Sequence, residues 1–162
     1  MAETWEDDAR WMEVALREAE TALEAGETPV GAVVVTEGRV VGRGSNRVET
    51  LNDPTAHAEI VAIGAAAEDL GSWRLPGCTI FVTLEPCTMC AGAVVLARID
   101  RVVFGAYDPK AGACGSVHDV FRVSALNHHP DVRGGVLEDR CGDLLKSFFT
   151  KLRNPREVEN RR

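Results

Sequence analysis

The chain has 162 residues, of which 45% are hydrophobic and 27% charged, a composition typical of a globular protein and not of a disordered or fibrous one. Its longest apolar stretches, 30–35 and 91–97, are much shorter than the ~20 residues that a membrane-spanning helix needs. Acidic side chains begin at Glu3, where a secretory signal would carry basic ones. We therefore expect one compact domain over residues 1–162, located in the cytoplasm.

Charge is unevenly distributed along the chain. The formal net charge of -7 weakly disfavours a nucleic-acid partner, because phosphate binding usually leaves a basic footprint. The first 27 residues hold nine acidic and two basic side chains, whereas the last 17 hold six basic and two acidic ones. The basic C-terminal helix and tail from about Lys146 fits a local anion site and, equally, a solvated helix end.

The first part of the sequence predicts a helix followed by a hairpin. Apolar residues recur at helical spacing between Thr4, a suitable N-cap, and Gly26, a suitable stop. Residues 30–35 and 39–44 are rich in β-branched side chains, and the turn between them contains Gly38. We expect a helix over 4–25 and two antiparallel strands.

Two further helices are expected in the middle of the chain. A polar stretch over 45–54 leads to Thr55, a good N-cap residue for a helix over 56–70. Residues 78–84 have the composition of a strand, and a second helix is expected over 87–97.

The last third completes an alternation of strands and helices. We expect a strand over 101–106, a loop over 107–116, a short helix over 119–123, a weak strand over 131–136 and a last helix over 137–151. This alternation after an opening hairpin predicts an α/β fold, with a mixed sheet of about five strands and helices on both faces.

A metal site is the strongest chemical prediction. Five cysteines cannot all pair, and Cys87 and Cys90 have the C-x-x-C spacing typical of metal or redox chemistry. With His57 they supply the three ligands of a catalytic zinc site, whose fourth position is left for water. Glu59, two residues after the histidine, is then the expected proton carrier rather than a ligand.

The segments 55–59 (Thr-Ala-His-Ala-Glu) and 86–90 (Pro-Cys-Thr-Met-Cys) match the zinc-deaminase signature. The expected reaction therefore rests on a known motif and not on the spacing of the residues alone. Along nearly its whole length the chain resembles the bacterial tRNA-specific adenosine deaminases of the cytidine/deoxycytidylate deaminase superfamily. The resemblance implies a three-layer α/β/α cytidine-deaminase-like fold. It also implies one zinc ion per subunit and conversion of adenosine to inosine at the wobble position of a tRNA anticodon.

The same resemblance implies substrate contacts and a partner. It assigns the base pocket to the Asn46 amide and the Ala58 backbone, and places Asp108 and Lys110 in a loop bordering the tRNA. It also implies a homodimer, for which the apolar residues 94–96 are a candidate face. The family usually has proline after its Asn-Arg pair, whereas Val48 stands here.

Two other functions stay open at this point. A structural zinc module would need a fourth ligand, such as Cys78 or Cys114, and would leave Glu59 idle. A deaminase of free bases or nucleosides would suit the net acidity. Asn46 also has a structural interpretation as an Asx-turn residue. The remaining histidines and cysteines are expected to have no metal role: Cys78, Cys114, His118, His128, His129 and Cys141.

Overall fold

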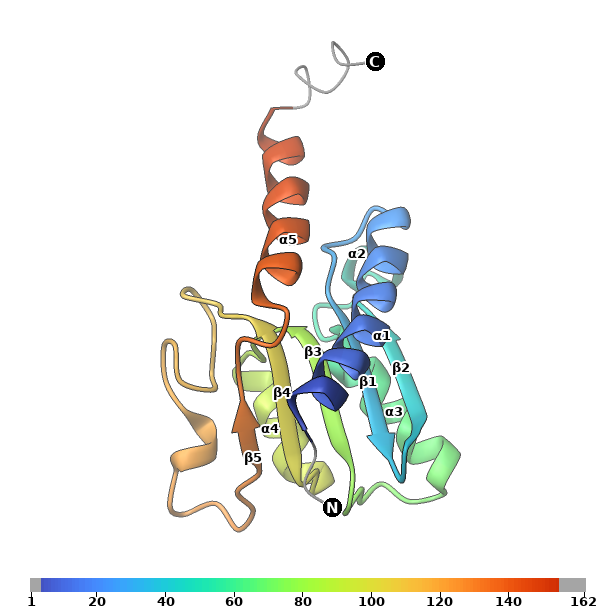
Figure 1. The fold of residues 1–162 in the computed structure, drawn as a ribbon, viewed down its shortest axis with the longest axis vertical. Coiled ribbons are helices and arrows are strands. Elements are labelled where there is room, and N and C mark those ends of the chain that lie inside the picture. Colours follow the sequence, from blue (N-terminus) through green and yellow to red (C-terminus); the bar gives the residue numbers. More distant parts are fainter. Residues whose placement is uncertain (1–3, 155–162) are drawn as a thin grey trace.

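The computed structural model describes residues 4–154, in which strands and helices alternate after an N-terminal helix (Figure 1). The helices are α1 (Trp5–Glu24), α2 (Val48–Leu51), α3 (Ala58–Leu70), α4 (Thr88–Ala97) and α5 (Glu138–Arg153), with a 3-10 helix η1 (Val120–Arg122). The strands are β1 (Gly31–Thr36), β2 (Arg39–Ser45), β3 (Thr79–Leu84), β4 (Arg101–Ala106) and β5 (Asp131–Arg133).

The strands form one mixed five-stranded sheet in the order β2-β1-β3-β4-β5. Strand β1 is antiparallel to β2 and β3, whereas β3 pairs in parallel with β4 and β4 with β5. Every strand except β1 therefore runs in the same direction. As a result, the carboxyl ends of β2, β3 and β4 share one edge of the sheet, and α3 and α4 begin near that edge.

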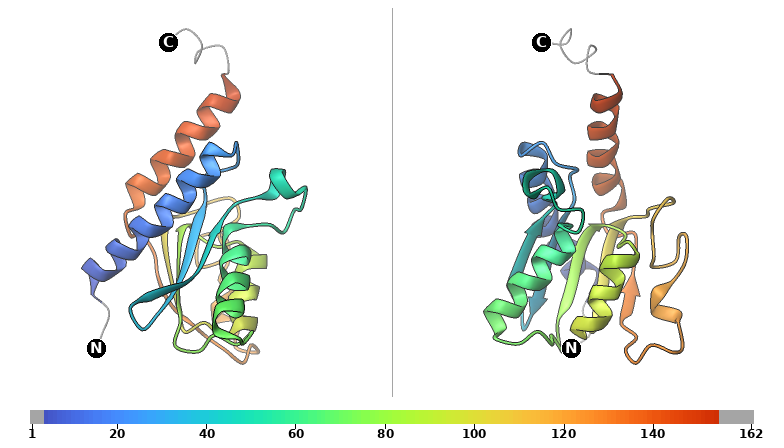
Figure 2. Two further views of the ribbon diagram at one scale, coloured as in Figure 1. Left: turned by 90° about the vertical axis from the view of Figure 1, so that its right-hand side faces the viewer. Right: turned by 180° about the vertical axis from the view of Figure 1, so that it is seen from behind.

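Helices cover both faces of the sheet. Helices α1 and α5 lie together on one face, and α3 and α4 lie on the other (Figure 2, left). An ion pair between Arg140 and Glu13 joins α5 to α1. The structure thus confirms the expected α/β fold with a three-layer α/β/α arrangement. No helix in residues 4–154 is both long and apolar enough to cross a membrane.

The position of α3 depends on a glycine in the neighbouring strand. A Cβ atom on Gly44 would lie 2.1 Å from the Ala58 carbonyl oxygen and 2.6 Å from the Ala62 nitrogen. Only a residue without a side chain lets the helix backbone approach β2 this closely. The start of α3, which carries His57 and Glu59, is therefore fixed against the end of β2.

A buried carboxylate joins α1 to the two strands at the β5 edge of the sheet. Asp8 is fully buried and accepts hydrogen bonds from both terminal nitrogens of Arg101 and from Arg133, each at 2.7 Å. Burial raises the pKa of Asp8, but these hydrogen bonds and charges outweigh it and leave the pKa below its usual value. The cluster ties the first helix to β4 and β5.

Three local expectations were wrong. Thr55 does not cap α3, because its backbone and hydroxyl bind the Asp53 carboxylate instead, and His57 is the N-cap. The stretch over 45–54 contains the short helix α2 and is not wholly irregular. Strand β5 ends at Arg133, just before the glycine pair at 134–135, so the expected strand over 131–136 is about half as long.

Candidate active site

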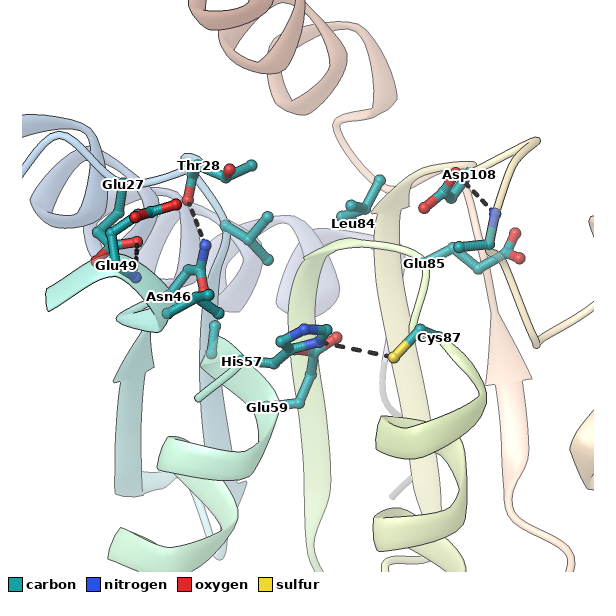
Figure 3. A pocket seen from close by; sticks show the side chains of 14 residues that line it. Glu27, Thr28, Asn46, Glu49, His57, Glu59, Leu84, Glu85, Cys87 and Asp108 are labelled. Carbon is teal, nitrogen blue, oxygen red and sulfur yellow. Dashed lines mark hydrogen bonds between the residues drawn. The ribbon is translucent and has the colours of Figure 1, made fainter. Parts of the chain in front are cut away.

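The candidate site is a cavity of about 280 Å³ at the shared edge of the sheet. Asn46 reaches it from the end of β2, His57 and Glu59 from the start of α3, Cys87 from the turn before α4, and Asp108 from the segment after β4. Figure 3 shows these side chains converging from separate elements. The residues expected from the sequence to share a site are therefore neighbours in space.

His57, Cys87 and Cys90 form a group that can hold a metal ion. Their ligand atoms all lie within 4.8 Å of one another. The Nδ1 atom of His57 is 3.6 Å from the Cys87 sulfur and 3.5 Å from the Cys90 sulfur. Within residues 4–154, neither Cys78 nor Cys114 joins this group. In the described part of the chain, neither of these cysteines therefore supplies the fourth ligand that a structural zinc module would need.

Two helix starts bring the group together. His57 is the N-cap of α3 and Cys87 the N-cap of α4, both with extended backbone conformations. Cys90 is the third residue of α4, so it projects beside Cys87 at the same helix end. We expected His57 and Cys87 inside their helices. Each instead lies one residue before the first residue of its helix, where its side chain can point across the edge of the sheet.

The protonation of the group favours a thiolate at Cys87. Hydrogen bonding from the Cys90 side chain, together with His57 and the Cys90 backbone, lowers the pKa of Cys87 to about 3 despite its partial burial. The neighbouring Cys87 sulfur and burial raise the pKa of Cys90. The hydrogen bond with Cys87 raises the pKa of His57. Thiolate is the form in which cysteine binds metals, so Cys87 is prepared to act as a ligand.

Glu59 is buried beside this group. Its side chain is 4% exposed, and this burial raises the pKa of Glu59 to about 7, although the neighbouring His57 charge and a hydrogen bond with Cys90 lower it. A carboxyl group with a pKa near neutrality can both accept and return a proton under physiological conditions. The position and pKa of Glu59 thus suit a proton carrier.

Asn46 contributes an unpaired acceptor to the pocket. Its side-chain nitrogen donates to the Thr28 carbonyl at 3.4 Å, and its buried side-chain oxygen has no hydrogen-bond partner among residues 4–154. This is not an Asx turn closed on its own loop, which was the structural interpretation. A buried acceptor without a partner is costly, so a donor on a bound molecule would stabilise this side chain.

Ala58 and Asp108 line the same cavity. Ala58 is fully buried as the first residue of α3. One Asp108 carboxylate oxygen accepts hydrogen bonds from the backbone nitrogens of Lys110 and Ala111, at 3.0 and 3.2 Å. Asp108 therefore holds the conformation of its own loop while forming part of the pocket wall.

Two buried glutamates in the lining were not identified from the sequence. Glu27 is 1% exposed and accepts hydrogen bonds from the backbone nitrogens of Thr50 and Glu49, at 2.6 and 3.2 Å. Glu85 is 2% exposed and binds Ser116. A sequence signal existed for Glu85, since an acidic residue directly after a buried strand and before a metal-ligand motif is unusual.

A second hollow extends from the pocket along α5. It shares Thr28, Leu84 and Asp108 with the first cavity, which makes the two hollows neighbours. Its other lining residues are basic, aromatic or apolar: Tyr107, Pro109, Lys110, Leu145, Lys146, Phe149, Leu152 and Arg153. Part of the expected basic tail thus borders the pocket, whereas residues 155–162 lie outside the described residues.

The histidines and cysteines that we expected to have no metal role lie outside the metal group. His118 pairs with the Thr88 hydroxyl at 2.9 Å, and His128 and His129 contact backbone carbonyls. The candidate dimer face over 94–96 is largely wrong, because Val94 and Val95 are buried in the core and only Leu96 is exposed.

Comparison with known protein families gives the class of the protein. The sequence matches the MafB19-like deaminase family over residues 6–153. The chain belongs to this family, and its fold is therefore that of a deaminase, which is an enzyme.

Individual relatives narrow the class. The chain is 47% identical over 151 residues to the tRNA-specific adenosine deaminase of Bacillus subtilis (strain 168), covering 93% of this chain and 94% of that protein. A structure from a study of A-to-I editing by tRNA:A34 deaminases at the wobble position of transfer RNA is 51% identical, with a TM-score of 0.81, covering 84% of this chain and 99% of the other. Within the deaminases, the chain belongs to the tRNA-specific adenosine deaminase family.

A guanine deaminase from Bacillus subtilis is also similar in structure. It is 40% identical with a TM-score of 0.58, and the match covers 60% of this chain and 63% of that one. Deaminases of free bases thus share part of this fold.

Proposed function

We propose that this protein is a zinc-dependent hydrolase that converts adenosine to inosine at the wobble position of tRNA anticodons. The observation that carries the proposal is the convergence of His57, Cys87 and Cys90 beside the buried Glu59. The substrate follows from the relatives, which are named for tRNA adenosine deamination.

The spacing of the three ligands supports zinc. With Zn–S bonds of about 2.3 Å and a Zn–N bond of about 2.0 Å at tetrahedral angles, sulfur and nitrogen lie about 3.5 Å apart. The distances from His57 Nδ1 to the two sulfurs are 3.6 and 3.5 Å. A zinc ion with three protein ligands supplies the Lewis acidity that makes a water molecule nucleophilic near neutral pH.

Glu59 is the proposed catalytic acid and base. Its carboxylate takes a proton from the attacking water and returns it to the purine ring nitrogen next to the reacting carbon. Glu59 then takes the proton of the added hydroxyl and gives it to the amino group, so the C–N bond breaks, ammonia leaves and the hydroxyl oxygen becomes the carbonyl of inosine. A pKa of about 7, produced by burial, permits both directions of transfer at physiological pH.

Asn46, Ala58 and Asp108 are the proposed substrate-binding residues. A flipped base is recognised through hydrogen bonds along its edge, and the buried side-chain oxygen of Asn46 offers an unpaired acceptor. The backbone of Ala58 lies in the first turn of α3, where N–H groups lack helical partners. Asp108 closes the wall on the opposite side (Figure 3).

The two hollows differ in charge, which suggests that the base binds in the first cavity and the phosphates bind along the second hollow. As far as the described residues go, the pocket lining contains neither lysine nor arginine. It contains five acidic side chains: Glu27, Glu49, Glu59, Glu85 and Asp108. The neighbouring hollow contains Lys110, Lys146 and Arg153, with Tyr107 and Phe149 exposed among them. A neutral base fits the first environment and a nucleic-acid backbone the second, where aromatic rings also offer stacking.

Three further properties belong to this proposal. We place the whole chain, 1–162, in one deaminase domain with a basic C-terminal helix and tail, and in the cytoplasm, where its tRNA substrate would be. We also propose a homodimer. Leu96 supports a contact on α4 because it is 69% exposed on a helix of apolar and small residues. Leu96→Glu should lower the mass measured by light scattering if α4 is the interface.

An assay with several substrates tests the function. Inosine formation is measured in an anticodon stem-loop RNA with a wobble adenosine, beside free adenosine, cytidine and guanine, with and without a chelator. Chelator-sensitive inosine in the RNA alone supports the proposal. Ammonia released from guanine, with no inosine in the RNA, would instead support the second candidate, a free-base deaminase, which the likeness to guanine deaminase makes the relevant rival.

A further inference from the structure

Glu85 is a buried acid that the proposed reaction does not use. It follows β3 and precedes Pro86 and Cys87, and its side chain is 2% exposed. Burying a carboxylate is costly unless hydrogen bonds or charges compensate for the lost hydration. Among residues 4–154, Glu85 forms no ion pair. Its carboxylate instead accepts hydrogen bonds from Ser116, from the hydroxyl at 2.5 Å and from the backbone nitrogen at 3.4 Å.

The loop is built to approach this carboxylate. A Cβ atom on Gly112 would lie 1.7 Å from the Glu85 carboxylate oxygen and 2.5 Å from the Asp108 carbonyl oxygen. Gly112 also donates from its backbone nitrogen to that Asp108 carbonyl, at 3.0 Å. A side chain at position 112 would displace the Glu85 carboxylate or the loop, and it would also clash with the Asp108 backbone. The close approach therefore requires glycine.

Two more contacts hold the same two segments together. The Ala113 nitrogen donates to the Pro86 carbonyl at 2.9 Å, and the Thr88 hydroxyl pairs with His118 at 2.9 Å. The segment 85–88 contains the ligand Cys87, whereas the loop 107–118 contains Asp108 and Ala111 of the pocket wall. Figure 3 shows Glu85 between Asp108 and Cys87.

We propose that Glu85 is a positioning residue, whose buried carboxylate binds Ser116 and thereby fixes the substrate wall at loop 107–118 against the turn that carries Cys87. The carboxylate itself touches neither the reacting atoms nor the metal ligands' donor atoms in this role. The proposal deepens the proposed function and rests on it for the identity of the substrate, but the link between Glu85 and the loop is a property of the fold.

Substitutions at both ends of the contact test the proposal. Glu85→Gln puts an amide nitrogen opposite one of the two Ser116 donors, Ser116→Ala removes the hydroxyl from an exposed position, and Ser116→Thr restores it. Glu68→Gln, on the exposed end of α3, is the matched control. The zinc-loaded full chain is measured for hydrogen exchange of residues 107–118, for zinc content, and for kcat and KM on the stem-loop RNA.

The expected result is a loosened loop with an intact metal site. Glu85→Gln and Ser116→Ala should each speed exchange in the loop by about tenfold or more and lower kcat/KM by about tenfold, mainly through KM, as the loss of a charge-assisted hydrogen bond predicts. One zinc per chain should remain. Ser116→Thr and Glu68→Gln should behave like the unaltered enzyme, and the double variant Glu85→Gln/Ser116→Ala should be no worse than either single one.

Two results would overturn the proposal. One is unchanged loop exchange in both single variants, and the other is additive losses in the double variant. If the unaltered enzyme fails to deaminate the RNA, the proposed function fails, but the exchange measurement still decides whether Glu85 holds the loop.

Discussion

Asp8→Asn is expected to destabilise the protein by about 3 kcal/mol, because breaking a buried ion pair costs about 3–5 kcal/mol and leaves its partners uncompensated. Asp8 is fully buried, whereas the side chains of Arg101 and Arg133 are 20% and 33% exposed. Both guanidinium groups can therefore regain some hydration, which places the cost at the lower end of the range. For a chain of this size the melting temperature should fall by about 6–12 °C.

The cost should also depend on pH. Because the folded-state pKa of Asp8 lies below its ordinary value of 3.8, its contribution is complete above that value and is lost as the pH falls through the lower folded-state pKa. The difference in unfolding free energy between the two proteins should thus be constant from neutral pH to about pH 5 and shrink below pH 4. Metal release at low pH affects both proteins and cancels in the difference.

Urea denaturation at several pH values measures this difference, with the exposed Glu20→Gln on the same helix as control. A loss below about 1 kcal/mol at pH 7, the range of surface ion pairs, would show that the cluster behaves as a surface pair. A difference that stays constant down to pH 3 would contradict the assignment of the effect to the Asp8 charge.

Three further predictions concern the site and its support. Glu59→Gln should retain zinc by elemental analysis but lose about 10²–10⁴-fold in kcat, and normal turnover would remove its catalytic role. Cys87→Ala should lose zinc and stability together, because ligand binding is coupled to folding; a full complement of metal would refute the ligand assignment. Gly44→Ala should cost about 1–3 kcal/mol or more by pushing α3 from β2, whereas Gly64→Ala, with open space around it, should stabilise α3 by about 0.5–1 kcal/mol in thermal melts.

Local patterns predicted the elements whose stability is local. The strand over 101–106 was predicted with its observed bounds, because residues 102–104 are apolar and mostly β-branched. Helix α2 was not predicted, since four residues carry little helical signal and their N–H groups bind Glu27, which lies 22 and 23 positions away in the chain. Thr55 is predicted as a cap from its residue type. In the structure its hydroxyl donates to the carboxylate of Asp53, two positions away, and not to the start of α3.

In the candidate site too, residues in short motifs were predictable, whereas residues with distant partners were not. His57, Glu59, Cys87 and Cys90 stand in short motifs, so the sequence alone predicts that they associate. Glu85 could not be given a role from the sequence, because its partner Ser116 is 31 positions away on a loop without regular structure. Longer-range contacts of this kind depend on strand order, which the residue pattern did not fix.

Other contacts hold the backbone beside Val48, where the chain departs from the family pattern. The resemblance to the family implies proline after the Asn-Arg pair, and Val48 here lacks the ring that restricts the backbone. In this chain Val48 begins α2, and the buried Glu27 binds the next two backbone nitrogens. Burial raises the pKa of Glu27, but the hydrogen bonds from Thr50 and Glu49 leave it below its ordinary value, so the carboxylate stays charged and binding.

The direction of the strands accounts for the chemistry at the pocket edge. Because β2, β3 and β4 run the same way, the N-termini of α3 and α4 both meet the edge where those strands end. Helix N-termini stabilise negative charge, and here they carry the imidazole and the two cysteine sulfurs of the metal group, of which Cys87 favours the thiolate. The same edge collects the carboxylates of the pocket, which repel phosphate. Under the proposed function, an RNA substrate would therefore insert its base alone, and its backbone would lie over the second hollow at Lys110, Lys146 and Arg153.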